Sequence, residues 1–154
     1  MKNIVIGIVV VGLIAVGLAL SPTPIRNSKN HTAVASVTLY KSPTCSCCVQ
    51  YTKYLREHNY DVDVVLTDDM EALRARYNIS DDMSSCHTMI VGDYFVEGHI
   101  PLEAVDKLIA EAPDVDGISL PAMPAGSPGM PGTKSEPFVI YELTKGIAKE
   151  FMSI

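Results

Sequence analysis

The chain contains 154 residues, with 12 Lys and Arg against 18 Asp and Glu, which gives a formal net charge of −6 at pH 7. This length accommodates one domain with short extensions. An acidic chain without a basic cluster argues against nucleic acid and anionic lipid headgroups as partners, so no nucleic-acid-binding function is expected.

The N-terminus carries an uncharged apolar run, Ile4–Leu20, of 17 residues. As a helix this run would be roughly 25 Å long, short of the roughly 30 Å of bilayer hydrocarbon but long for the apolar part of a signal peptide. We expect residues 1–20 to be a membrane anchor, with a signal peptide as the alternative, and residues 21–36 to be a polar tether. Either interpretation exports the remaining domain, residues 37–154.

The domain alternates between strand and helix patterns, and Gly92-Asp93 suits the two-residue turn of a hairpin. In chain order we expect a strand at 37–40, a helix from 44 or 46 to about 58, a strand at 61–66, a helix from 70 to 77, strands at 88–91 and 94–96, and a helix from 101 to 113. This β-α-β-α-β-β-α order predicts an α/β domain of the thioredoxin-like kind.

The later segments complete the predicted domain. In the last helix, an inward face is expected to contain Leu102, Val105, Leu108 and Ile109. Residues 121–137 are rich in proline and glycine and cannot form regular structure. A closing β-hairpin is expected from strands at 138–143 and 147–151.

Cys45 and Cys48 form a C-x-x-C motif at the predicted turn from strand to helix. Amide groups at a helix N-terminus stabilise thiolates, and such motifs have thiol pKa values of roughly 3.5–7.5 rather than about 8.5. A thiolate is both a redox nucleophile and a metal ligand, so the motif alone leaves both chemistries open.

Cys47 lies between these two cysteines. On a helix it would be rotated about 200° from Cys45, because each residue advances about 100°. We therefore expect it to point away from a simple redox pair, and three adjacent thiolates suit sulfurs that bridge metal ions.

Cys86 and His87 lie in the loop that enters the third strand, which in a thioredoxin-like fold faces the C-x-x-C motif. His99 follows the antiparallel fourth strand, whose far end returns to the same edge of the sheet. If the fold prediction holds, the sulfurs of all four cysteines and two imidazoles converge from three segments.

Four motifs in this order resemble the CopG-like copper-resistance proteins of the bacterial envelope: TCSCC (44–48), SSCHTMIV (84–91), EGHIP (97–101) and PAMPAGSPGM (121–130). The resemblance implies a thioredoxin-like domain that holds copper through cysteines and handles its redox state. It makes Cys45, Cys47, Cys48 and Cys86 the sulfur ligands. Together with the apolar run at 4–20, it implies a periplasmic or other extracytoplasmic domain tethered to the inner membrane, with copper-handling envelope proteins as partners.

The chain departs from the family pattern at two positions. Ser46 stands where the family usually has glycine, and Tyr51 stands where a tryptophan is usual. Neither change removes a ligand, but Tyr51 is expected to alter the packing or a wall of the site.

The chemistry of the residues agrees with copper, because clustered thiolates with thioethers nearby select Cu(I). Met123 and Met130 are candidate weak ligands, and His87 and His99 are candidates either as ligands or as walls of the site. We expect a multinuclear Cu(I) site with a role in copper tolerance. The alternatives are a thiol–disulfide oxidoreductase, with Cys45 as nucleophile and Cys48 as resolving thiol, and a pair of structural disulfides.

Overall fold

A computed structural model describes residues 34–154. The predicted anchor or signal at 1–20 and the tether as far as residue 33 lie outside the described residues. Within residues 34–154, no helix is both long enough and apolar enough to cross a membrane. The elements are β1 (Ser36–Lys41), α1 (Ser46–Glu57), β2 (Asp61–Leu66), α2 (Met70–Arg76), the 3₁₀ turn η1 (Asp81–Met83), β3 (His87–Val91), β4 (Tyr94–Glu97), α3 (Leu102–Glu111), β5 (Gly117–Ser119), β6 (Val139–Thr144) and β7 (Ile147–Ser153).

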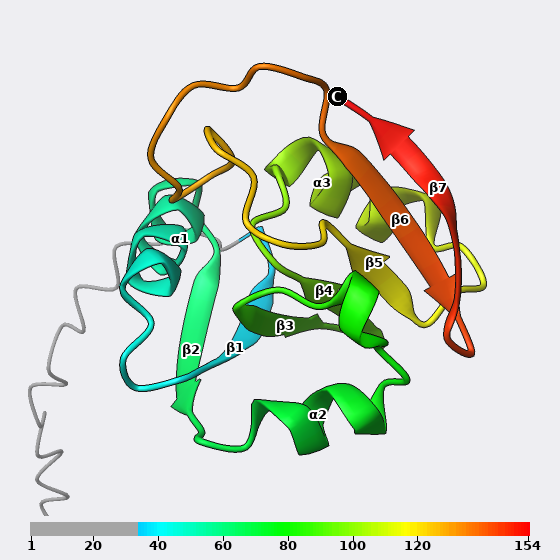
Figure 1. Cartoon of the computed structure of the whole chain (residues 1–154), viewed down its shortest axis with the longest axis horizontal. Helices are drawn as coiled ribbons and strands as arrows, with labels where there is room; N and C mark the ends of the chain where they lie inside the picture. The colour runs from blue at the N-terminus through cyan, green and yellow to red at the C-terminus, as the bar shows by residue number, and fades with distance from the viewer. Residues whose placement is uncertain (1–33) are drawn as a thin grey trace, which may run out of the picture. The chain divides into compact units, whose positions relative to one another are not determined.

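The strands form one seven-stranded sheet in the order β2-β1-β3-β4-β5-β6-β7 (Figure 1). β1 pairs with β2 in parallel, while β3 is antiparallel to both β1 and β4. The expected α/β class and the order of the first seven helices and strands are confirmed. The thioredoxin-like assignment stays a prediction.

β5 is a strand that the sequence did not predict. It has only three residues, too few to show alternation, and it pairs in parallel with β4 and antiparallel with β6. Gly117 is required there, because a Cβ at this position would overlap the carbonyl oxygen and ring of Phe95. The expected C-terminal hairpin is present as β6 and β7, and β5 makes it continuous with the rest of the sheet.

The helices α1 and α3 share one hydrophobic core with one side of the sheet. Tyr51 and Leu55 of α1 pack in the same cluster as Val105 and Leu108 of α3. The expectation for Ile109 was wrong, because its side chain is 39% exposed. It lines an open depression at the surface with Ala35, Val91 and Tyr94, so these neighbours cover it only in part.

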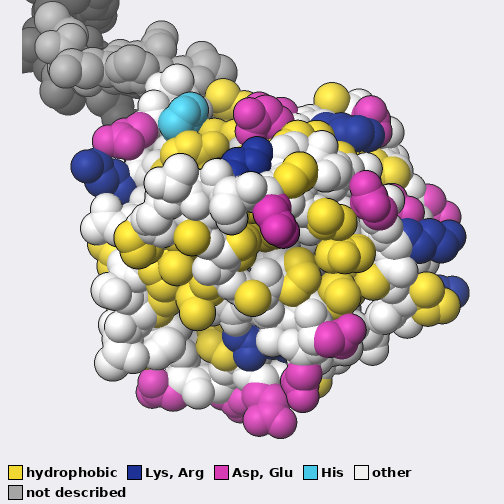
Figure 2. Space-filling model, turned by 45° about the horizontal axis from the view of Figure 1, so that its top comes forward, with side chains coloured by type: hydrophobic (Ala, Val, Ile, Leu, Met, Phe, Trp, Pro, Cys, Tyr) yellow, Lys and Arg dark blue, Asp and Glu magenta, His cyan; other side chains and the backbone are white. Residues whose placement is uncertain are grey.

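A second, smaller cluster contains Ile79, Phe95 and Leu143, with Tyr77 packed against it. Phe95 and Val96 belong to different clusters because successive residues of a strand point to opposite faces. On the face drawn in Figure 2, basic side chains are scattered among acidic ones rather than gathered into a patch.

Candidate metal centre

The first cysteine of the C-x-x-C motif caps α1. Cys45 has an extended backbone (φ −71°, ψ 100°), and its sulfur accepts a hydrogen bond from the backbone N–H of Cys48 at 3.3 Å. Cys45 and Cys48 are joined as a disulfide in this structure. The predicted placement of the pair at the start of a helix is therefore confirmed, and the structure describes its oxidised form.

Cys47 does not point away from this pair, as the helical rotation had suggested. Its Sγ lies 3.5 Å from Cys45 Sγ and 3.7 Å from Cys86 Sγ. The expectation was wrong because Cys45 is the capping residue, outside the helix, and its side chain folds back over the first turn. Cys47 thus contacts both Cys45 of the α1 turn and Cys86 of the loop before β3.

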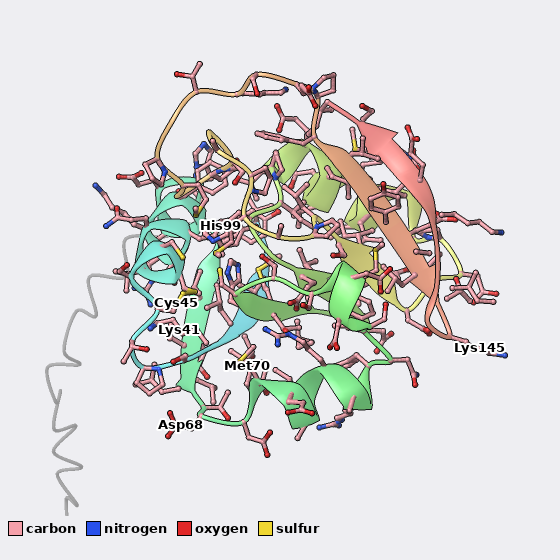
Figure 3. The ribbon with its side chains drawn as sticks, in the orientation of Figure 1. Lys41, Cys45, Asp68, Met70, His99 and Lys145 are labelled. Carbon is pink, nitrogen blue, oxygen red and sulfur yellow. A yellow bond between two sulfur atoms is a disulfide. The ribbon has the colours of Figure 1, made fainter. Side chains whose placement is uncertain are left out.

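Cys86 completes the cluster from the loop before β3. Its Sγ lies 3.5 Å from Cys48 Sγ, and the four cysteine sulfurs all lie within 4.8 Å of one another. Cys48 is fully buried and the other three are half-buried. Figure 3 shows Cys45 beside Lys41 at the α1 end of the molecule, with His99 nearby and Lys145 at the opposite side. The structure brings the predicted sulfur ligands together; that they hold a metal stays a prediction.

The two candidate histidines are both fully buried and, with Cys86, form a second group of potential ligands. His99 Nε2 lies 3.0 Å from Cys86 Sγ, and its Nδ1 lies 2.7 Å from the carbonyl oxygen of Pro128. Because a carbonyl oxygen can only accept, Nδ1 carries the hydrogen and the lone pair of the neutral Nε2 faces Cys86.

His87 is held differently. Its Nδ1 lies 3.4 Å from Cys86 Sγ, while its Nε2 is buried without a hydrogen-bond partner among the described residues. Such an orphaned buried nitrogen is costly unless a water or a metal ion satisfies it.

Burial decides the protonation of these groups. Burial and, to a smaller extent, the neighbouring Cys47 raise the pKa of the Cys86 thiol to about 12. Burial also lowers the pKa values of both His87 and His99. Without metal, Cys86 is therefore a neutral thiol beside two neutral imidazoles, and a cation that binds its sulfur must displace a proton.

Tyr51, which stands where the family usually has tryptophan, packs against both candidate histidines and so forms a wall of the site. Its ring centroid lies 4.6 Å from that of His87 and 5.4 Å from that of His99, and its hydroxyl donates to the carbonyl oxygen of Ile100 at 2.8 Å.

Three charged residues near the cluster were not predicted. Glu97 and Lys41 are almost completely buried, and Arg74 of α2 pairs with Glu97 at 3.3 Å. Lys41 Nζ donates to the carbonyl oxygen of Ser42 at 2.9 Å, directly before the cysteine turn. The available signal was a Glu at the end of the apolar strand YFVE, directly before Gly98-His99.

The methionines are less clearly part of the centre. Met123 is 47% exposed. Met130 is half-buried and follows Gly129, whose position lies against the backbone of Gln50 and Tyr51. Their role as ligands stays a prediction.

Comparison with known proteins agrees with this geometry. A family model described as "Protein of unknown function, DUF411" matches residues 83–130. A solved structure described as "Copper resistance protein copG- Form 2" is 32% identical with a TM-score of 0.72, over 78% of this chain and 98% of that chain. The Form 1 structure is also 32% identical, with a TM-score of 0.71, over 78% of this chain and 97% of that chain. No curated protein matches.

Proposed function

The chain belongs to the CopG family of copper-resistance proteins, and from this premise we propose that it binds Cu(I) as cargo through Cys45, Cys47, Cys48 and Cys86. The observation that carries the proposal is the convergence of four cysteine sulfurs within 4.8 Å of one another. Soft thiolate sulfur selects Cu(I) over harder ions such as Mg²⁺ or Ca²⁺.

The donor set fits more than one ion. Cys86 belongs both to the sulfur cluster and to the group with His87 and His99, so its sulfur can bridge neighbouring copper ions. His87, whose Nδ1 lies 3.4 Å from Cys86 Sγ, and the lone pair of His99 that faces Cys86 provide two further donors.

Binding through all four sulfurs requires the Cys45–Cys48 disulfide to be reduced. That reduction takes two electrons and two protons and leaves two thiols, which lose their protons to the solvent when copper binds. The backbone N–H of Cys48, 3.3 Å from Cys45 Sγ, stabilises the Cys45 thiolate at the start of α1.

The disulfide itself favours a second candidate, a thiol–disulfide oxidoreductase. Cys45 and Cys48 would then form the redox pair, and Cys47 and Cys86 would be dispensable. The copper proposal requires the opposite, that loss of Cys86 is as harmful as loss of Cys45.

An anaerobic titration of the fully reduced, full-length chain separates the two candidates. We expect uptake of more than one Cu(I) per chain in preference to Zn(II), and comparable losses of affinity in Cys45→Ala and Cys86→Ala. If Cu(I) is not taken up, and a partner disulfide is reduced equally well by wild type and Cys86→Ala, the oxidoreductase is the correct assignment.

The cellular part of the proposal is copper tolerance in the envelope by sequestration, transfer or redox cycling. The apolar run at 4–20 supports export with a membrane anchor, and the order β2-β1-β3-β4 supports the thioredoxin-like assignment. Fusion of alkaline phosphatase after residue 154 tests export, because that enzyme is active only outside the cytoplasm.

The double variant Met123→Leu/Met130→Leu tests whether the two methionines are copper ligands, and unchanged Cu(I) affinity would remove them from the ligand set.

A further inference from the structure

A buried ion pair lies beside the loop that carries Cys86. Arg74 Nε of α2 lies 3.3 Å from Glu97 Oε1 at the end of β4, and the side chain of Glu97 is fully buried while that of Arg74 is 23% exposed. Neither residue is among the candidate ligands, and neither is in the C-x-x-C segment.

Both residues of the pair hydrogen-bond to the backbone of Ser85, the residue directly before Cys86. Glu97 Oε1 accepts from the Ser85 N–H at 2.7 Å, and the Arg74 guanidinium donates to the Ser85 carbonyl oxygen at 2.5 Å. Glu97 Oε2 accepts from the Thr88 hydroxyl at 2.5 Å. The Cys86 loop is thus held by charged groups on both sides of the cysteine.

Glu97 is also the residue directly before the turn that carries His99. Gly98 follows Glu97 with φ +87°, and a Cβ there would lie 2.6 Å from the carbonyl oxygen of Leu120 and 2.8 Å from the Ser85 side chain. The Gly98 N–H donates to the carbonyl oxygen of His87 at 3.0 Å. Glu97 therefore joins the two segments whose side chains meet in the 3.0 Å contact between Cys86 Sγ and His99 Nε2.

A buried ion pair is a weak source of stability, because the desolvation of two charges offsets most of their attraction. Replacing both partners with neutral residues of similar size is often harmless to stability, whereas removing one leaves a buried charge. What the pair provides here is a fixed geometry for both backbone groups of Ser85.

We propose that Arg74 and Glu97, the Arg74–Glu97 clamp, are positioning residues that hold Cys86 at its ligand distance from His99 and the other sulfurs and thereby set the affinity for Cu(I). The effect on Cu(I) affinity rests on the proposed function, whereas the positioning of Cys86 by the two residues does not. It assigns α2 a role in the centre, although α2 contributes no ligand.

The test uses the double variant Arg74→Met/Glu97→Gln of the full chain, which removes both charges together. In the reduced, metal-free protein we expect alkylation of Cys86 by iodoacetamide, followed by peptide mass spectrometry, to become at least about 10-fold faster, with Cys47 changing less. We expect Cu(I) affinity to fall roughly 10–100-fold, the usual cost of losing a group that orients a ligand. The matched control, Lys107→Met/Glu111→Gln, removes the ion pair within α3 and should change neither quantity.

A conservative variant keeps the test decisive if the double variant fails to fold. Arg74→Lys retains the charge, but its single ammonium group cannot reproduce the guanidinium fork that reaches both Glu97 and Ser85. We expect it to fold, to alkylate faster at Cys86 and to bind Cu(I) more weakly. Wild-type alkylation rates and Cu(I) affinity in the folded variants would overturn the clamp. Faster alkylation in a chain whose wild type binds no Cu(I) would support the clamp while refuting the proposed function.

Discussion

The imidazole of His99 connects the cysteine cluster to the proline- and glycine-rich loop. One ring nitrogen faces Cys86 Sγ and the other donates to the carbonyl oxygen of Pro128. These two contacts can be separated by substitution, because an Asn amide approximates the Nδ1 position of imidazole and a Gln amide approximates Nε2.

We expect His99→Asn to keep the bond to Pro128 and to lose the contact with Cys86. It should therefore lower Cu(I) affinity by about 10-fold or more, and cost little beyond the cavity that it leaves. His99→Gln should instead lose the loop contact, with a cost in unfolding free energy of about 0.5–1.5 kcal/mol and a smaller effect on copper. Urea denaturation and Cu(I) competition titrations measure the two effects, and the reverse order in both assays would contradict this division of roles.

Single residues also show what the sequence could predict about the site. Spacing and strand direction predicted that Cys86 and His99 meet Cys45 and Cys48, because topology alone places those segments at one edge of the sheet. The orientation of Cys47 depends on one capping residue with non-helical dihedrals, which a helical wheel does not represent. The Arg74–Glu97 clamp joins residues 23 positions apart on different elements, and no local pattern encodes such a contact.

At the scale of elements, the loop at residues 121–137 packs against α1 at Gln50 and Tyr51. Gly129 has φ +80°, and a Cβ there would lie 2.7 Å from the backbone nitrogen of Tyr51. The loop reaches this position without regular structure, and it is tied to the Cys86 loop by the bond from the Ala122 N–H to the carbonyl oxygen of Ser84 at 3.0 Å.

Gly129→Ala should therefore separate the loop from α1. Gly92→Ala is the matched control, because Gly92 also has a positive φ (+57°) but nothing lies within 4 Å of a Cβ at its position. We expect the control to cost about 1–2 kcal/mol for left-handed backbone strain, and Gly129→Ala to cost roughly 1–3 kcal/mol more for the clash. Equal urea unfolding free energies for the two variants would show that the loop yields without strain.

The elements also differ in how well the sequence predicted them. Those with a clear period or a capping signal, such as α1, β2 and the β3–β4 hairpin, were predicted to within a few residues. β5 was missed because its three residues owe their conformation to pairing on both sides. The position of Ile109 was wrong because periodicity identifies a helix face but not where its neighbours end.

At the scale of the whole molecule, folding buries two uncharged imidazoles. Desolvation lowers the pKa values of His87 and His99, and the charge of Lys41, together with that of His99 once it is protonated, lowers the pKa of His87 further. In the unfolded chain both groups titrate near 6.5. Below that pH the unfolded chain binds protons that the native protein does not, so stability falls as pH falls towards the lowered native pKa values.

We expect the unfolding free energy of the metal-free protein to be constant between about pH 7 and pH 8 and to decrease below about pH 6.5. The limiting slope is about 1.4 kcal/mol per pH unit for each buried imidazole. Glu97 opposes this trend at lower pH, because burial raises its native pKa despite the hydrogen bonds from Thr88 and Ser85 and the charge of Arg74. The clearest window is therefore pH 7.5 to 5.5, measured by urea denaturation at several values.

His87→Asn tests which groups cause the slope of unfolding free energy against pH, because it removes one titrating group from the core. The control is His58→Gln, which removes an exposed imidazole at the end of α1. The His87 variant should lose up to half of the slope, whereas the His58 variant should follow wild type. A slope that survives in His87→Asn would mean that other groups cause the acid sensitivity. Prior loading with Cu(I) should move the fall to lower pH if copper occupies these nitrogens, because protons then compete with the ion for the same lone pairs.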